Sequence, residues 1–448
     1  QPVNLLLPRV ARWSEVQERV MYCLIPESFP PKEGGVETYL LNVSESLATR
    51  GVCVLAPWQE GCEAFDSTQH LDIQRIHAGN DIQFRNLLGG FSRAVERIVR
   101  QREGGRRLTP QDVGKLMRIT HSVDSRHMVY ILQVFSRLAE IQTEVGIDVL
   151  HIGTVLPSGA VGLWARQFFG IPFVPYVHAA EINYWQRFPK GKELLLRTLE
   201  ESARIVAVCE YARSQLLVLG IEENKIVKIC PGVDSERFSS EAGIGDIRRR
   251  YGLDDKVVIL TVSHLVARKG HDTVLKALPA LVKEFPNIVY LVVGRGPYRA
   301  ALEALALELG LQEHVIFAGY VDGQNLSAYY NICDIFAMVS REIGWNIEGF
   351  GIVYIEASAA GKPIVAGRSG GTADAVIDGD TGILVDPESH TEVARALRRL
   401  LRSRELRRKL GQNGRERVKR MFSWERVRKE IEELNLDIEE RNRHASRD

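Results

Sequence analysis

The sequence predicts a two-domain α/β protein in which each domain has a parallel β-sheet covered by helices on both faces. Its 448 residues exceed the roughly 250–300 residues at which a single hydrophobic core stops growing. From Val20 onward, short runs rich in β-branched residues alternate with longer segments of helical periodicity, which is typical of parallel sheets with crossover helices. This periodicity is lost at residues 239–243, after a turn at 231–234, so we place the join between the domains there.

Apolar runs in the first half predict six strands, at residues 20–25, 52–56, 148–152, 172–177, 205–208 and 225–229. Similar runs in the second half predict five more, at residues 257–262, 288–293, 314–317, 335–339 and 363–366, and helical segments follow most of them. A charged amphipathic segment begins near residue 422. We therefore expect a first domain over residues 1–236, a second over 237–423, and a helix at about 424–445 that crosses back onto the first domain.

A long helix-rich stretch at about 80–144 does not fit a minimal domain of this kind, and we expect it to be a helical insertion. Within it, residues 91–107 form a basic amphipathic segment, with apolar residues such as Phe91 and Val95 on one face and arginines such as Arg97 away from it. A helix of this kind binds the surface of a membrane, but a solvated helix packed on its own domain has the same pattern. We favour the packed helix and keep peripheral contact with the inner face of the membrane as the alternative.

Composition and charge exclude several classes of protein. The formal net charge of +1 lacks the basic excess expected of a general nucleic-acid-binding protein. No apolar run approaches the ~20 residues that span a bilayer, and the N-terminus lacks an apolar signal segment. The six scattered cysteines have no C-x-x-C pair and no histidine at zinc spacing, so we expect reduced core thiols. These observations predict a cytoplasmic protein.

The segment from Glu348 to Glu356 is the most informative for chemistry. Gly349, Phe350 and Gly351 lead into a short predicted helix, where free backbone amides attract a phosphate. Glu356 lies inside that helix and is placed to accept hydrogen bonds from two ribose hydroxyls. Glu348 lies just before the helix, within reach of a sugar beyond the phosphates. Taken alone, the two glutamates also fit surface charges favoured near a helix N-terminus.

Other loops of the second domain favour the functional interpretation. The loop at 263–270 follows a predicted strand and carries Arg268 and Lys269, which can hold a diphosphate as a planar fork and as a point charge. Two further loops follow strands and contain glycine and arginine: residues 294–297, with Gly294, Arg295 and Gly296, and residues 367–372. Because the carboxyl ends of parallel strands meet at one edge of a sheet, these loops together predict a nucleotide-diphosphate site.

These segments resemble the retaining glycosyltransferases of family four, which have the GT-B fold of two facing Rossmann-like domains with a cleft between them. The likeness is closest to the bacterial mannosyltransferases that act on phosphatidylinositol mannosides, through residues 348–356. In that family the first glutamate of the pair contacts the transferred sugar and the second holds the ribose. The resemblance implies these roles for Glu348 and Glu356, and implies that Lys269 grips the phosphates.

The chain departs from that family at one position of the loop that holds the phosphates. His264 stands where the family usually has an arginine. A neutral histidine holds a diphosphate less firmly than an arginine fork does. Either Arg268 and Arg295 compensate, or the affinity for the donor is low.

Segments of the first domain match the family as well. Gly34 and Gly35, between the first strand and the first helix, resemble its acceptor-side loop, which approaches the donor phosphates, although a Gly-Gly pair before a helix is also a common turn. His178, at the end of a buried strand, matches the family histidine beside the donor sugar. Residues 209–211 and 231–234 match family loops, and we expect them to form the cleft wall and the hinge.

No metal or other cofactor is expected. Asp378 and Asp380 have the Asp-x-Asp pattern that clamps a metal in other glycosyltransferases, but they lie in a hairpin-like turn between apolar runs. We favour the turn. Arg268, Lys269 and the backbone amides of residues 349–351 are expected to neutralise the charge that a metal ion neutralises elsewhere.

The resemblance implies transfer of a hexose from a nucleotide-diphosphate sugar, with retention at the anomeric carbon by front-face attack. GDP-mannose is favoured as the donor, with a UDP-sugar as the alternative. A lipid-linked glycan, a polysaccharide and a small molecule all remain open as acceptor. In this scheme Lys269 and Arg268 stabilise the leaving diphosphate, Glu348 contacts only the sugar, and His178 packs beside that sugar.

Two other functions would use the same loops. A nucleotide-sugar epimerase or hydrolase of the same fold would turn the donor over at full rate without an acceptor. A catalytically inactive nucleotide-sugar-binding protein would lose the groups of the first domain; the retained His178 speaks against it, while His264 speaks for it. An NAD-dependent enzyme is disfavoured because no G-x-G-x-x-G follows a strand. The oligomeric state is not predicted.

Overall fold

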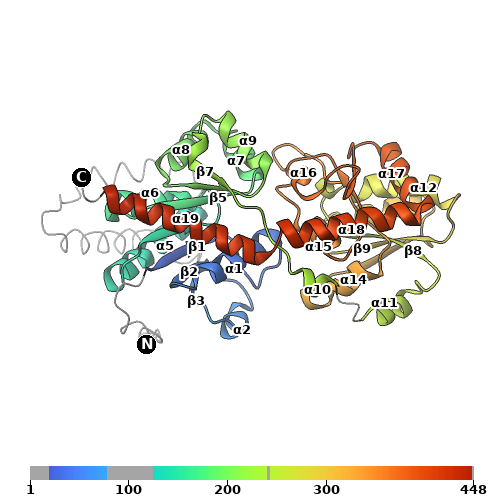
Figure 1. The fold of residues 1–448 in the computed structure, drawn as a ribbon, viewed down its shortest axis with the longest axis horizontal. Coiled ribbons are helices and arrows are strands. Elements are labelled where there is room, and N and C mark those ends of the chain that lie inside the picture. Colours follow the sequence, from blue (N-terminus) through green and yellow to red (C-terminus); the bar gives the residue numbers. More distant parts are fainter. Residues whose placement is uncertain (1–19, 78–124, 240–242, 446–448) are drawn as a thin grey trace, which may run out of the picture.

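The structure is a computed structural model, and it describes residues 20–77, 125–239 and 243–445. Figure 1 shows two lobes side by side along the long axis of the molecule, each with a sheet accompanied by helices. None of the helices in this described part is long and apolar enough to cross a membrane. The basic segment at 91–107 lies outside the described residues, so its contact with a membrane stays a prediction.

Seven parallel strands form the sheet of the first domain, in the spatial order β3-β2-β1-β4-β5-β6-β7. The strands are β1 (Tyr22–Ile25), β2 (Val52–Pro57), β3 (Asp72–Ile76), β4 (Val149–Ile152), β5 (Phe173–Val177), β6 (Ile205–Ala207) and β7 (Ile226–Lys228). The central strands are buried on both faces, which is why their sequences are continuous apolar runs. The strand order reverses between β1 and β4, and crevices that bind ligands form at such a reversal.

Six parallel strands form the sheet of the second domain, in the order β10-β9-β8-β11-β12-β13. They are β8 (Val257–Val262), β9 (Ile288–Val293), β10 (Val315–Gly319), β11 (Ile335–Met338), β12 (Ile364–Gly367) and β13 (Gly382–Val385). Here the order reverses between β8 and β11, so the loops after these two strands flank the corresponding crevice. The predicted α/β architecture with two parallel sheets is confirmed.

Helices connect the strands and cover the sheets. Those of the first domain are α1 (Gly35–Leu47), α2 (Cys62–Ser67), α5 (Ser125–Glu144), α6 (Gly159–Phe169), α7 (Ala180–Trp185), α8 (Pro189–Glu201) and α9 (Glu210–Val218). Those that follow are α10 (Ser235–Ser239), α11 (Ile244–Tyr251), α12 (His271–Val282), α13 (Arg299–Glu308), α14 (Leu326–Ile332), α15 (Ile352–Ala359), α16 (Thr372–Ala375), α17 (His390–Arg402), α18 (Arg404–Met421) and α19 (Trp424–Ala445). The proposed domain boundary at 236/237 falls inside α10, which packs on α14 and α15.

The last helix, α19, crosses from the second domain to the first, where Figure 1 shows it in red along the left lobe. It packs on α1 and β4. Asn435 accepts a hydrogen bond through Oδ1 from Nε2 of the buried His151, at 3.0 Å. Asp437 forms an ion pair with Arg204 at 2.7 Å. These contacts fasten the C-terminal helix to the first sheet and link the two domains a second time.

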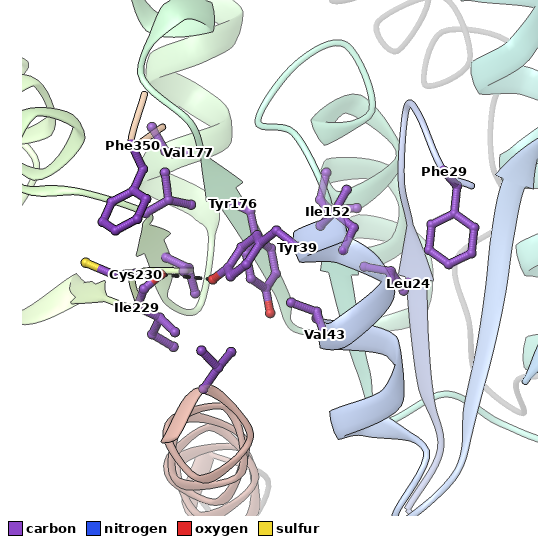
Figure 2. Close-up of a cluster of buried hydrophobic side chains, with 14 of the residues drawn as sticks. Leu24, Phe29, Tyr39, Val43, Ile152, Tyr176, Val177, Ile229, Cys230 and Phe350 are labelled. Carbon is purple, nitrogen blue, oxygen red and sulfur yellow. Dashed lines mark hydrogen bonds between the residues drawn. The ribbon is translucent and has the colours of Figure 1, made fainter. Parts of the chain in front are cut away.

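The hydrophobic core is continuous between the two domains. Figure 2 shows Tyr39 of α1 beside Tyr176, with ring centroids 5.9 Å apart, and its hydroxyl donates a 3.0 Å hydrogen bond to the carbonyl oxygen of Ile229. Phe350, from the second domain, belongs to the same buried cluster. Its ring meets the edge of Phe422, just before α19, with centroids 5.5 Å apart. The core therefore holds the two domains against each other.

Two strands differ from the sequence-based expectations. Strand β3 was not predicted, because it is half-buried along its whole length and its polar residues Asp72, Gln74 and Arg75 break the apolar pattern. The turn at 377–382 does not make a hairpin, because the strand that follows it, β13, pairs with β12 in parallel. The predicted insertion at about 80–144 is described only from residue 125 onward, where it forms α5.

Candidate active site

The loops on either side of the crevice in the second sheet bring Lys269 and Glu348 together. Lys269 ends a short 3-10 helix (Ala267–Lys269) that follows β8, and Glu348 lies in the loop after β11. Nζ of Lys269 lies 2.5 Å from Oε2 of Glu348. The same oxygen accepts hydrogen bonds from Arg268 at 2.9 Å and from the hydroxyl of Ser340 at 3.0 Å. Three donors thus converge on one carboxylate oxygen at the predicted edge of the sheet.

The electrostatics of this cluster keep Glu348 ionised. Glu348 is 6% exposed and Lys269 is 9% exposed. Burial alone raises the pKa of the Glu348 carboxyl, but Lys269 and Arg268 outweigh that effect and hold its pKa at about 2. An ionised carboxylate beside two cations can share those cations with a diphosphate or release them to it.

The backbone after Glu348 carries glycines that let the first domain approach it closely. A Cβ atom at Gly349 would lie 2.4 Å from the carbonyl oxygen of His178, in the other domain, so a side chain at this position would push the domains apart. Gly351 has φ +80°, which favours glycine, and it opens α15. By contrast, the Phe350 side chain is 3% exposed and packs in the core between the domains. Only the backbone of Phe350 can face a ligand.

His178 lies directly after β5, and its backbone carbonyl oxygen faces Gly349 of the second domain. Its Nε2 bonds the carbonyl oxygen of Gly153 at 2.8 Å, and a carbonyl accepts only, so Nε2 carries the proton. The backbone N–H of His178 donates to a carboxylate oxygen of Glu181. The next residue, Ala179, has φ +91°, a strained value for a residue with a side chain. The loop is therefore held in a costly conformation that places His178 against Gly349.

Gly34 and Gly35 lie at the N-terminus of α1, on the first-domain side of the same interface. A Cβ atom at Gly35 would lie 3.5 Å from the side chain of Ile352 in α15, and one at Gly34 would collide with the Glu37 carboxylate, at 2.3 Å. Glu37 is buried, and it accepts a hydrogen bond from Ser28 at 2.5 Å. The structure thus brings the predicted acceptor-side loop next to the helix that follows Glu348.

Glu356 is on the second turn of α15 and is half-buried. The hydroxyl of Tyr330, in α14, donates a 2.6 Å hydrogen bond to its Oε2. Burial raises the pKa of Glu356, while the hydrogen bond from Tyr330 opposes that shift. The sequence did not indicate Tyr330 as a site residue, because no local motif relates a tyrosine to a glutamate 26 residues further along the chain.

The remaining predicted residues of the second domain lie around this cluster. Gly294 and Gly296 pack against the backbone of the 263–265 loop. His264 is exposed and bonds the carbonyl oxygen of Arg295 through Nδ1 at 3.0 Å. The Arg295 guanidinium lies over the ring of Tyr320, 4.7 Å from its centroid, and the Tyr320 hydroxyl donates to Glu33 of the first domain at 2.6 Å. Arg295 therefore supports a contact between the domains and is not part of the Glu348 cluster.

The loop at 367–372 packs behind Glu348. The backbone N–H of Gly371 donates to the carbonyl oxygen of Glu348 at 3.1 Å. Beside it, Tyr211 of the first domain and residues of the second, among them Ile347 and Gly370, line a cavity of about 340 Å³. Asp374 accepts a 2.8 Å hydrogen bond from the backbone N–H of Glu210. Residues 209–211 thus form part of the wall between the domains.

Asp378 and Asp380 engage separate partners. Asp378 accepts a 2.9 Å hydrogen bond from the backbone N–H of Leu384, and Asp380 accepts one from Asn413 at 2.8 Å. Throughout residues 20–77, 125–239 and 243–445, no group of three or more His, Cys, Asp or Glu side chains is placed to hold a metal ion. These contacts explain why both aspartates occur in the turn.

A two-domain α/β protein with cations and glycine loops at facing sheet edges fits the class of transferases that use nucleotide-sugar donors. The family model described as "Glycosyl transferases group 1" matches residues 244–417, and that described as "Glycosyltransferase Family 4" matches residues 104–237. The chain belongs to glycosyltransferase family four and has the GT-B fold. The predicted family and fold are confirmed.

Named relatives and solved structures agree with this assignment. The GDP-mannose-dependent alpha-(1-6)-phosphatidylinositol monomannoside mannosyltransferase of Mycolicibacterium smegmatis is 31% identical, over 81% of this chain and 84% of that protein. The protein of the same name from Mycobacterium tuberculosis is 30% identical, over 90% of this chain and 94% of that protein. In fold, the chain is similar to Anabaena HepE in complex with UDP-glucose, with a TM-score of 0.72 and 18% identity over 94% of this chain and 100% of HepE. The protein is a glycosyltransferase that uses a nucleotide-sugar donor.

Proposed function

We propose that the protein transfers mannose from GDP-mannose to a hydroxyl of a lipid-linked glycan, with retention of configuration and without a metal ion. The observation that carries the proposal is the cluster of Lys269, Arg268 and Glu348 at the crevice of the second sheet. Two relatives, one 31% identical over 81% of the chain and one 30% identical over 90% of it, are named as GDP-mannose-dependent mannosyltransferases of phosphatidylinositol monomannoside. That supports both the donor and the class of acceptor.

Each part of the donor has a matching group in this arrangement. Lys269 and Arg268 hold the diphosphate, together with the free amides at the N-terminus of α15. Glu356 accepts hydrogen bonds from the ribose hydroxyls. Glu348 holds the mannose and, through its ion pairs, orients the two cations. His178 closes the site from the first domain and helps to exclude water.

The reaction then needs no protein nucleophile. The bond from the anomeric carbon to the diphosphate oxygen breaks, and its electron pair stays on that oxygen. The acceptor oxygen bonds to the anomeric carbon on the same face, and its proton passes to the departing phosphate oxygen. Lys269 and Arg268 stabilise the negative charge that grows on the leaving group. Glu348 is unsuited to attack the sugar, because two cations hold its negative charge.

The test is a donor panel with a defined acceptor. The protein would be incubated with GDP-mannose, UDP-glucose or UDP-N-acetylglucosamine and with phosphatidylinositol monomannoside in detergent micelles. We expect mannosyl product from GDP-mannose alone, with an α linkage by NMR. Product from a UDP-sugar would overturn the proposed donor. Full-rate loss of GDP-mannose without acceptor would favour a hydrolase or epimerase, and tight GDP binding without turnover would indicate an inactive binding protein.

A further inference from the structure

The crevice of the first sheet lies between the loops that follow β1 and β4, where the strand order reverses. Glu27 is the second residue after β1, and Ser158 belongs to the segment after β4. Oε1 of Glu27 accepts two hydrogen bonds from Ser158, from the backbone N–H at 2.9 Å and from the hydroxyl at 3.1 Å. These bonds span the crevice, as the Lys269–Glu348 ion pair spans the corresponding crevice of the second sheet.

The chemical state of Glu27 is unusual for a surface carboxylate. In the described part of the chain, no lysine or arginine forms an ion pair with it. Burial raises the pKa of Glu27 to about 8, because the hydrogen bonds from Ser158 only partly offset the loss of water, and the nearby Glu181 adds to the shift. The residue is nevertheless half-buried rather than sealed in the core. A polar ligand in the crevice would supply a partner besides Ser158, which the described residues do not provide.

Glu27 also lies near the part of the active site that is proposed to hold the sugar, and a single loop, the one after β4, connects the two places. The Cα atom of Pro26 would be 3.0 Å from a Cβ atom at Gly153. The carbonyl oxygen of Gly153 is the one that His178 bonds, and His178 in turn lies against Gly349. The contacts of Glu33 with Tyr320 and of Gly35 with Ile352 show that the carboxyl edge of the first sheet faces the second domain.

We propose that Glu27 is an acceptor-binding residue: its carboxyl group bonds a hydroxyl of the incoming polyol, a sugar or a cyclitol ring, in the crevice between the β1 and β4 loops. Ser158 fixes one oxygen of the group, and the other oxygen is directed to the ligand. This inference rests on the proposed function, because it assigns a place to the acceptor of that reaction.

The experiment compares wild type with three variants of the crevice, Glu27→Ala, Glu27→Gln and Ser158→Ala, and with one control variant. For each, three quantities are measured: the KM for phosphatidylinositol monomannoside in micelles, the rate of GDP-mannose hydrolysis without acceptor, and the dissociation constant of GDP by calorimetry. Glu193→Gln, an exposed glutamate on α8 of the same domain, is the matched control.

Glu27→Ala should raise the acceptor KM by about tenfold or more, the scale of one lost hydrogen bond to a carboxyl group. Ser158→Ala should raise it less, because the backbone N–H still holds Glu27. Glu27→Gln should retain most of the affinity, since an amide still bonds a hydroxyl. GDP binding and acceptor-free hydrolysis should stay within about twofold of wild type. A variant in which the loop after β1 lost its structure would instead lose both.

Two results would overturn the inference. One is an acceptor KM in Glu27→Ala equal to that of wild type and of Glu193→Gln. The other is a parallel loss of GDP affinity, which would make Glu27 a structural residue of the whole site. Failure of the proposed function looks different, because it appears already in the wild-type protein as an absence of mannosyl product from GDP-mannose.

Discussion

Lys269 and Glu348 form a buried ion pair in which Nζ lies 2.5 Å from Oε2, and Arg268 shares the same oxygen. The sequence alone led us to expect that Glu348 contacts only the transferred sugar. The structure corrects this view, because Glu348 also holds the two cations assigned to the diphosphate. In the proposed donor complex, the diphosphate must therefore share these cations with the Glu348 carboxylate or displace it from them, so binding of the diphosphate and binding of the sugar are coupled.

Glu348→Gln should lower the stability of the ligand-free protein and cut turnover. Removal of one partner of a buried ion pair leaves an uncompensated charge and costs about 3–5 kcal/mol. The freed cations can then bind phosphate without competition, so GDP should raise the Tm of the variant more than that of wild type. We expect kcat to fall by about a hundredfold, the scale for loss of one preorganised polar contact. Thermal unfolding with and without GDP, together with product assays, measures both effects.

Glu284→Gln is the matched control for that variant. Glu284 also binds two cations, Arg398 and Arg402, but at the protein surface. Exposed pairs contribute little to stability, so this variant should keep the Tm and the activity of wild type. Equal effects of the two substitutions, or normal turnover in Glu348→Gln, would remove Glu348 from the centre of the site.

Lys269→Ala should weaken GDP binding and also slow the transfer step, because in the proposed mechanism the lysine contacts the phosphates before and during bond cleavage. We expect at least about a tenfold loss in each, since hydrogen bonds to charged groups have this scale. Lys276→Ala is a suitable control, because Lys276 lies in the nearby helix α12 and pairs with Asp272 at 3.8 Å. Normal GDP affinity in Lys269→Ala, measured by calorimetry, would contradict the assigned role.

Glu356 should make GDP binding depend on pH in a defined direction. The ionised carboxylate is the better acceptor for ribose hydroxyls, so GDP binding should weaken as pH falls through the pKa of Glu356. Burial raises that pKa, and the weakening should begin at a higher pH than for an ordinary glutamate. Tyr330→Phe removes a hydrogen bond that lowers the pKa of Glu356, so the transition should move to still higher pH.

Glu356→Gln completes this comparison. It cannot ionise, so its GDP affinity should be lower than that of wild type at neutral pH and should lack the acid transition. The titration of the nucleotide itself is common to all three proteins and cancels between them. Identical pH profiles for wild type, Tyr330→Phe and Glu356→Gln in calorimetry would place Glu356 outside the ribose site.

Transfer should continue in excess chelator. In the proposed mechanism two cations, the buried Lys269 and the half-buried Arg268, neutralise the leaving diphosphate, so that no metal ion is needed for this purpose. Asp378 accepts a hydrogen bond from Leu384 and Asp380 accepts one from Asn413, so each carboxylate has a separate protein partner. Product formation would be followed after dialysis against EDTA, with and without added magnesium or manganese. Activity that is lost with chelator and restored by metal would show that an ion takes part.

Much of the fold could be predicted from the sequence because parallel strands buried on both faces leave unbroken apolar runs, as in β8 (Val257–Val262) and β9. Strand β3 has no such run, since it is half-buried and carries Asp72 and Arg75. Strand β13 was obscured by the turn at Asp378, whose residues suggested a hairpin. In both cases neighbouring strands, and not local pattern, decide the structure.

In the candidate site, too, some residues could be predicted from the local sequence and others could not. Lys269 and Glu348 could be found because each follows a predicted strand, at the edge where α/β ligands bind. Ser340 and Tyr330 could not, because a serine at a strand end and a tyrosine in a helix have no distinctive local signal. Their roles appear only when folding brings them to Glu348 and Glu356. Glu27 was missed for a similar reason, since its partner Ser158 is 131 residues away.

His264→Arg should strengthen GDP binding. His264 is exposed, in the same loop as Lys269, and bonds a backbone carbonyl through Nδ1. An arginine there would add a permanent positive charge and a fork that matches phosphate oxygens, and charge-assisted bonds are roughly twice as strong as neutral ones. We expect about a tenfold lower dissociation constant in calorimetry at low salt, with a smaller gain at high salt because exposed charges are screened.

His314→Arg is the control for this variant. His314 also bonds a backbone carbonyl, that of Ile288 at 2.9 Å, but it lies at the opposite end of the sheet, before β10. If both substitutions change GDP affinity equally, the gain reflects net charge alone, and His264 does not face the diphosphate.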